Sequence, residues 1–468
     1  MVHSSSHLVE YKYLKPSSVT KGRNCIRFMR MEPKSKLVAT ASFGEGRGGC
    51  IVNENKKDRL SNLPDEIVHH ILSSSLKTPI LDIEDLTMFS CVSKRCRQLV
   101  LSNPTLRFDG FQRTRISTCS KRSKLMNSFD RLLACRGDCK LQVFDVSWYS
   151  HYSWTTPCFC EDNKFRVFTW IYNVLDRYKV ETLHVFIEQG LLDDDDILPA
   201  FPSYIFHCDS LRSLKVDVNC MIQAPSFAFS SNLRSLVLTS VTIVDEEFFK
   251  WISCCCKFIE DLCLDSVYGP KNVTIESSSL ELFHFKCAAN SRICHLHISG
   301  EKLKEIAVDW SFNPYRKISF GILAPNLKRY RWTGNLINHP NLGNLVSLEE
   351  AEIRLKPILD GWDNVLEILC RLRGVKVVLL TEEVTKTSGF NMGHWKLQDP
   401  ALFNQLKEFT IELWGEPNGI ELARYILEHS QNLEKMVIVH LPQHSHVKRE
   451  LSKSKTISNA KLFFSTYT

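Results

Sequence analysis

The sequence has no long hydrophobic run and little net charge over most of its length. No segment reaches the roughly 18 apolar residues that a membrane-spanning helix requires, and no apolar stretch with a small-residue cleavage site marks a secretory signal. The formal charge is +7, but residues 1–60 hold about 12 Lys or Arg against about 5 Asp or Glu, which accounts for the whole excess. We therefore expect no membrane contact and no nucleic-acid groove in the folded part.

Enzyme signatures are also missing. We find no G-x-S-x-G, no G-x-x-x-x-G-K-[ST] and no H-E-x-x-H, so no class of enzyme and no cofactor is indicated. The 18 cysteines follow no secretory signal, and we expect reduced thiols in the nucleus or cytoplasm.

Several cysteine, histidine and aspartate groups resemble fragments of a metal site, but none has a matching second half. They are Cys135 with Cys139, His151 with Cys158 and Cys160, Cys294 with His295 and His297, and the four aspartates from Asp193. Staggered oxygen ligands and a turn-forming Gly, which calcium needs, are absent from the aspartate run. We predict no metal site, and we interpret Cys254, Cys255 and Cys256 as helix packing residues.

Composition and pattern divide the chain into four parts. Residues 1–57 mix Ser, Gly and Lys without periodicity, which predicts a disordered basic leader; a nuclear-targeting or transit role stays open, and Met31 is a possible second start. A helical block follows at residues 58–108. We assign residues 109–400 to a repeat region and residues 401–468 to a C-terminal region.

The spacing apolar-x-x-apolar-x-apolar recurs ten times after the helical block. The copies start at Val180, Leu211, Leu233, Ile259, Leu280, Leu303, Leu327, Leu348, Leu406 and Leu433. Except for the longer interval between Leu348 and Leu406, successive copies lie roughly 21 to 31 residues apart, within or slightly above the period of leucine-rich repeats. Ten copies in one phase favour this architecture over the alternative of unrelated strands in a β-sandwich.

Each repeat predicts one short strand whose apolar side chains are buried only when neighbouring repeats stack. The expected fold is therefore α/β, a solenoid with a curved parallel sheet. Segments with helical spacing, from Glu246 and from Trp362, are expected to cover its convex side. The position five after the second repeat Leu is Asn219 in one copy but Val241 and Val267 in others, so we expect no regular amide ladder.

The stretch S-N-L-P-D-E-I-V-H-H-I-L from Ser61 has one apolar stripe and a Pro in its first helical turn. Together with C-V-S-K-R-C-R-Q-L-V from Cys91, it resembles a plant-type F-box, a three-helix module that docks on a Skp-type adaptor. The resemblance implies an adaptor-binding surface made of Leu63, Pro64, Ile67, Ile71, Leu72, Val92, Ser93, Lys94 and Arg95. Cys96 stands where that family usually has Trp. The alternative is an N-terminal cap that shields the first repeat, and both roles are compatible.

The segment from Leu406 to Ile438, which contains N-L-E-K-M-V-I, resembles the FBD region of plant F-box/LRR proteins. Here it predicts a strand, a helix over Glu421–His429 and a second strand, which extend the solenoid at its C-terminal end. The family assigns no chemistry to this region.

The residues between the inward positions of each strand are expected on the concave face, because side chains alternate along a strand. Their signs alternate from repeat to repeat, which suits a folded protein or peptide partner better than a phosphate backbone. We predict a target-binding face that contains Ser213, Lys215, Asp217, Asp261, Asp265, His284, Lys286, Glu305, Asp309, Arg329, Arg331, Glu350, Glu352 and Arg354.

The resemblance implies a substrate-recognition subunit of an SCF-type ubiquitin ligase, which binds a cullin through the adaptor and holds an unknown target protein. Such a subunit acts through effective concentration and performs no bond chemistry. The alternative is a repeat scaffold or ligand receptor whose F-box has lost its use, for which Cys96 is the motivating feature. A metal-dependent enzyme and a pocket for a small hormone-like ligand are further alternatives.

Overall fold

A computed structural model of the chain places Arg59–Thr468 in one compact unit. It describes residues 62–73, 83–109, 119–149, 163–188, 198–287, 291–313, 316–335, 340–343, 345–355, 372, 374–381, 404–413, 417–444, 446–454 and 457–466. The predicted leader at 1–57, the helical segment from Trp362, and His151, Cys158, Cys160 and Asp193 lie outside these residues.

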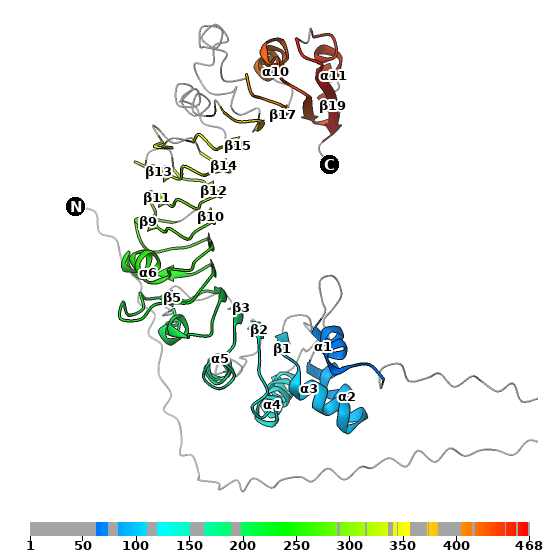
Figure 1. Cartoon of the computed structure of the whole chain (residues 1–468), viewed down its shortest axis with the longest axis vertical. Coiled ribbons are helices and arrows are strands. Elements are labelled where there is room, and N and C mark those ends of the chain that lie inside the picture. Colours follow the sequence, from blue (N-terminus) through cyan, green and yellow to red (C-terminus); the bar gives the residue numbers. More distant parts are fainter. Residues whose placement is uncertain are drawn as a thin grey trace, which may run out of the picture. The chain divides into compact units, whose positions relative to one another are not determined.

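Three short helices open the described chain (Figure 1): α1 (Asp65–Ser73), α2 (Ile83–Val92) and α3 (Lys94–Ser102). The acidic residues in the first turn of α1 favour its positive end. The hydroxyl of Ser93 caps α3 by accepting from the Cys96 N–H at 3.0 Å, which satisfies one of its free donors. The helices share a core of Val68, Leu72, Leu86, Leu99 and Val100. The expected three-helix module is thus present.

A parallel sheet of 14 strands follows. Its spatial order is the chain order, apart from strands that belong to two smaller sheets. The strands are β1 (Thr105–Asp109), β2 (Val143–Tyr149), β3 (Thr182–Glu188), β4 (Ser213–Val218), β6 (Ser235–Thr239), β8 (Asp261–Asp265), β10 (Leu282–Lys286), β12 (Glu305–Trp310), β14 (Arg329–Gly334), β15 (Glu350–Leu355), β16 (Val377–Thr381), β17 (Glu408–Leu413), β18 (Lys435–His440) and β19 (Lys461–Thr466).

The ten repeat copies all form strands of this sheet, and their inward residues lie in register. Leu214 of β4 pairs with Leu236 of β6, which pairs with Leu262 of β8. These three side chains are 0% exposed, so each strand is buried by its neighbours as stacking requires. The predicted leucine-rich-repeat solenoid with a parallel sheet is confirmed.

Both helices and strands cover the other side of the repeats. The helices are α4 (Cys119–Cys135), α5 (Asn163–Tyr178), α6 (Glu247–Cys255), α10 (Pro417–His429) and α11 (His446–Leu451), with 3-10 helices η1 (Ser203–His207) and η3 (Pro442–His444). Strands β9 (Asn272–Glu276), β11 (His295–Ser299) and β13 (Ser319–Leu323) form a separate parallel sheet, and β5 (Met221–Ile222) pairs with β7 (Thr242–Ile243).

Helix α6 confirms the segment predicted from Glu246, and α10 contains the predicted Glu421–His429 helix. No element was predicted for the far side over residues 272–323, where β9, β11 and β13 lie. The connections there are short, and extended segments fill them.

Three strands of the large sheet, β1, β2 and β16, were not predicted. Strands β2 and β16 carry the repeat spacing as Leu141-Phe144-Val146 and Val375-Val378-Leu380, all buried. Strand β1 starts at Thr105, so the sheet begins within the range 58–108 assigned to the F-box.

Within the described residues, no helix combines the length and hydropathy that crossing a bilayer demands.

Gly334 at the end of β14 has φ +135°, and a Cβ there would lie 2.0 Å from the Trp310 carbonyl oxygen of β12. We predict that Gly334→Ala lowers the free energy of unfolding by about 2 kcal/mol or more, because backbone strain of about 1–3 kcal/mol adds to this clash. Gly137→Ala is the matched control, since Gly137 has φ +65° with nothing within 4 Å. Chemical denaturation followed by circular dichroism measures both, and an equal loss in the two variants would contradict the prediction.

Candidate protein-binding surfaces

The three-helix module exposes apolar side chains that its own core does not use. Ile67 and Ile71 of α1 are 47% and 48% exposed, and Val92 at the end of α2 is 74% exposed. Met88 of α2 is 64% exposed. We call Ile67, Ile71, Met88 and Val92 the apolar surface of the module. Large exposed apolar groups gathered on one small unit are typical of an interaction site.

The other residues of the predicted adaptor surface have different positions. Leu72 is 7% exposed and lies in the core of the module, because it follows the buried Val68 by one helical turn. Leu63 is half-buried and packs against the same core. Pro64 and Lys94 are exposed. Leu72 therefore supports the surface from within, and the adaptor-binding role of the whole set stays a prediction.

Arg95 and Ser93 hold the module together. The Arg95 guanidinium donates to the Leu63 carbonyl and forms an ion pair with Asp65 at 2.9 Å. This contact fixes the start of α1 against the start of α3. Cys96 is buried at 9% exposure, so it is not part of the exposed apolar surface. Met88 was missed by the sequence reasoning, although it is one of the most exposed apolar residues of α2.

The second surface is the face of the 14-stranded sheet that points away from the core, which we call the polar sheet face. All the predicted concave-face residues lie on it, since their neighbours along each strand are the buried ones. The register aligns them in rows. One row runs Ser213, Ser235, Asp261, Leu282, Glu305, Arg329 and Glu350, and the next runs Lys215, Val237, Cys263, His284, Ala307, Arg331 and Glu352.

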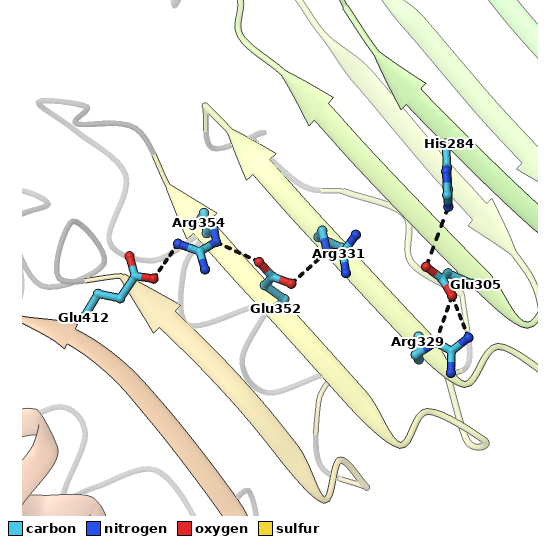
Figure 2. Close-up of polar contacts among 7 residues, drawn as sticks. All are labelled: His284, Glu305, Arg329, Arg331, Glu352, Arg354 and Glu412. Carbon is cyan, nitrogen blue, oxygen red and sulfur yellow. Dashed lines mark hydrogen bonds and ion pairs between the residues drawn. The ribbon is translucent and has the colours of Figure 1, made fainter. Parts of the chain in front are cut away.

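Charged residues on neighbouring strands pair within this face (Figure 2). Arg329 of β14 binds Glu305 of β12 at 2.7 Å. Arg331 of the same strand binds Glu352 of β15 at 2.7 Å. His284 of β10 lies 3.6 Å from Glu305 on its other side. The two arginine side chains are 55% and 52% exposed, while Glu305 and Glu352 are 17% and 26% exposed. The carboxylates thus lie beneath the guanidinium groups and orient them outward.

The ion pairs continue into the C-terminal region. Arg354 binds Glu352 at 2.7 Å and also binds Glu412 of β17, so one guanidinium joins strands on both sides of β16 (Figure 2). The Glu412 side chain is 8% exposed. A buried carboxylate of this kind requires a partner, because an unpaired charge away from water is costly.

The pairing changes the ionisation of both central glutamates. Burial alone would raise the pKa of Glu305, but the hydrogen bond and charge of Arg329 outweigh it and hold the pKa below its usual value. Burial likewise opposes ionisation of Glu352, and the hydrogen bonds from Arg354 and Arg331 together lower its pKa. Both groups therefore stay ionised at neutral pH.

On the strands before β12 the pairing is looser. Asp145 of β2 lies between Arg107 of β1 at 3.6 Å and His184 of β3 at 3.8 Å; these three residues were not predicted. Lys286 lies 3.5 Å from Asp265. The Ser235 hydroxyl donates to Asp261 at 3.1 Å. Lys215, Glu350 and Asp309 lie on the same face, with Lys215 and Glu350 exposed. The face presents mixed charge along its length.

No group of three or more potential metal ligands occurs among the described residues. Cys255 and Cys256 are buried at 6% and 1% exposure, whereas Cys254 is exposed. The interpretation of all three as packing residues is therefore wrong for Cys254, which lies on the outer side of α6. Burial raises the pKa of the Cys256 thiol to about 12, with a further contribution from Cys255.

The in-register parallel strands and their buried leucine rows define a leucine-rich-repeat protein. The family model described as FBD-associated F-box protein At5g56370, LRR repeats, matches residues 170–328, and the FBD family model matches residues 402–438. The chain thus carries both types of domain.

Relatives from Arabidopsis thaliana extend the similarity. F-box/LRR-repeat protein At3g59190 is 25% identical over 423 residues, which cover 84% of this chain and 95% of that protein. F-box/FBD/LRR-repeat protein At5g56420 is 24% identical over 444 residues, which cover 87% and 99%. At4g03220, described as an F-box/FBD/LRR-repeat protein, is 26% identical over 310 residues that span only 56% of its length. Across most of its residues the chain is therefore similar to F-box/LRR-repeat and F-box/FBD/LRR-repeat proteins of Arabidopsis thaliana.

We predict that Arg354→Met destabilises the protein by about 1–3 kcal/mol, because it leaves the Glu412 carboxylate buried without its partner. The double variant Arg354→Met with Glu412→Gln should recover part of the loss, since the buried charge is then absent. Denaturation midpoints measure both. A double variant less stable than Arg354→Met alone would contradict this role for Glu412.

The lowered pKa values of Glu305 and Glu352 predict a pH dependence of stability. A carboxyl group whose pKa is lower in the folded state stabilises the fold above its unfolded pKa, and this contribution is lost as pH falls through the folded value. We expect the free energy of unfolding to decrease from neutral pH into the acidic range below the ordinary glutamate pKa. The variant with Glu305→Gln and Glu352→Gln should show a shallower decrease of the free energy of unfolding over that range than the wild type. If both proteins show the same pH dependence in denaturation experiments, the two glutamates are not its cause.

Proposed function

We propose that the protein is the substrate-recognition subunit of an SCF-type ubiquitin ligase, acting in the nucleus or cytoplasm. The observation that carries the proposal is the apolar surface of the module: Ile67, Ile71, Met88 and Val92 are about half exposed or more, although the module has a complete core of its own. A second polypeptide, a Skp-type adaptor, would cover these side chains. The similarity to F-box/LRR-repeat proteins supports the same partner.

The polar sheet face is the proposed site for the target protein. Its arginines are held in place by carboxylates beneath them, so little side-chain entropy is lost when a partner binds. Its charges are largely balanced, which favours a partner with a complementary arrangement of both signs over a uniformly charged polymer. No bond is made or broken at this face; the protein raises the local concentration of the target near the ligase.

Adaptor binding through the apolar surface predicts that Ile71→Ser with Val92→Ser weakens the complex at least tenfold, about 1.4 kcal/mol. Both side chains are about half exposed or more, so we expect the variant to fold. The measurement is titration of the purified full-length protein with a Skp-type adaptor by calorimetry. Val346→Ser is the matched control, because Val346 is 70% exposed in the repeat region. Equal affinity of the wild type and the double variant would overturn the proposal.

The wild type and the double variant also distinguish adaptor binding from target binding. In affinity capture, the double variant should lose the adaptor and the cullin together while it retains other bound proteins, because the polar sheet face is unchanged. A wild-type protein that binds no adaptor would favour the alternative of a repeat scaffold without a ligase role.

A further inference from the structure

The two edges of the 14-stranded sheet are covered very differently. At the first edge, Leu106 and Phe108 of β1 are each 1% exposed. Phe108 packs against Phe129 of α4 and Trp170 of α5, both at 4.9 Å between ring centroids. Helix α2 of the module also contacts β1. The apolar residues of the first strand are thus buried without help from another molecule.

At the other edge, no described strand covers the far side of β19. Among the described strands, β19 pairs with β18 alone (Figure 1). Its inward residues Leu462 and Phe464 are only half-buried, whereas Met436 and Ile438, their partners in β18, are 0% exposed. Phe463 on the opposite side of the strand is 47% exposed. Strand β19 has the apolar pattern of a repeat, but the described residues do not bury it as they bury the inner strands.

The backbone of β19 carries hydrogen-bonding groups toward the open edge. The Lys461 N–H donates to the Glu434 carbonyl at 3.0 Å, toward β18. Because alternate residues of a parallel strand bond to opposite neighbours, the backbone groups of Leu462 and Phe464 face away from β18. Such an edge is a template for pairing with another chain.

The side-chain charges near the start of β19 indicate which charged group a partner strand would carry. Lysines near the start of the neighbouring strands have acidic partners: Lys435 binds Glu408 at 2.8 Å and Lys407 binds Glu434 at 2.9 Å. Lys461 lies in register with Lys435, which already has its carboxylate. No described acidic side chain forms an ion pair with Lys461. A carboxylate is therefore the complementary group on the open side of Lys461.

We propose that the β19 edge binds an extended segment of a partner protein as one more parallel strand, with the pattern acidic-apolar-x-apolar. The acidic residue pairs with Lys461, and the two apolar residues cover Leu462 and Phe464. Strand β17 shows this arrangement within the chain itself: its E-F-T-I places Glu408, Phe409 and Ile411 beside Lys435, Met436 and Ile438. Addition of a strand to an edge is a common mode of peptide recognition.

This site is independent of the module at the other end of the sheet and of the polar sheet face. It does not rest on a ligase role, and variants at Ile71 and Val92 should not affect it.

The test uses the full-length protein and two fluorescent peptides with polar flanks. One contains L-K-E-F-T-I-E-L, the sequence of residues 406–413, and the other has Lys in place of its first Glu. Fluorescence anisotropy should show tighter binding of the Glu peptide to the wild type by about fivefold, the effect of one exposed ion pair. Lys461→Glu should reverse this preference. Lys453→Glu is the matched control, since Lys453 is exposed in the turn after α11, and it should behave as the wild type.

Three results would overturn the proposal. The first is no saturable binding of the Glu peptide to the wild type. The second is equal binding of a peptide with the reversed sequence, which places its carboxylate away from Lys461. The third is self-association of the wild type in sedimentation that Lys461→Glu abolishes, which would assign the edge to a second copy of the chain.

Discussion

Burial of one strand by the next is the constraint on which this structure depends. A five- or six-residue strand has only two or three inward side chains, and no single repeat can remove them from water. The rows that contain Leu214, Leu236 and Leu262 are buried because each strand continues the row of its neighbour. The stability of each repeat therefore depends on its neighbours on both sides. The strands at the two ends of the sheet have a neighbouring strand on one side only, so their apolar residues must be covered in another way.

The same register controls the polar face. Since the inward residues fix which strand positions lie opposite each other, the outward residues have no freedom in their choice of neighbours. Arg331 meets Glu352 because Trp332 meets Ile353. A shift of one residue would turn every charge into the core. Ion pairs at this surface add little stability individually, but they hold the arginines in one orientation, which is useful for selective recognition.

Much of the fold follows from the sequence, because the repeat spacing marks the apolar residues that point inward in each strand. Strand β16 was missed for a physical reason: Val377 and Leu379 on its polar face are also apolar, so the alternation disappears. The strands on the far side of residues 272–323 were missed although N-V-T-I-E and H-L-H-I-S alternate polar and apolar residues as strands do; the repeat spacing alone does not indicate them. On the module, the apolar stripe does not show which of its residues are buried, and only coordinates separate the buried Leu72 from the exposed Ile71.

The inward-facing and exposed apolar residues of the module are different sets, which bears on the choice between a cap and a docking unit. Leu132 of α4 packs against both the module core and the repeat core. The buried Arg136 donates to the Asn103 carbonyl after α3 and to the Lys140 carbonyl at 2.9 Å, which joins the end of the module to the first repeats. These contacts cover the first strand with residues that face inward. Ile67, Ile71, Met88 and Val92 take no part in them. A unit that only capped the repeats would have no need for these four exposed apolar side chains. Their exposure therefore favours a partner that binds to them while the inward residues still cover the first repeat.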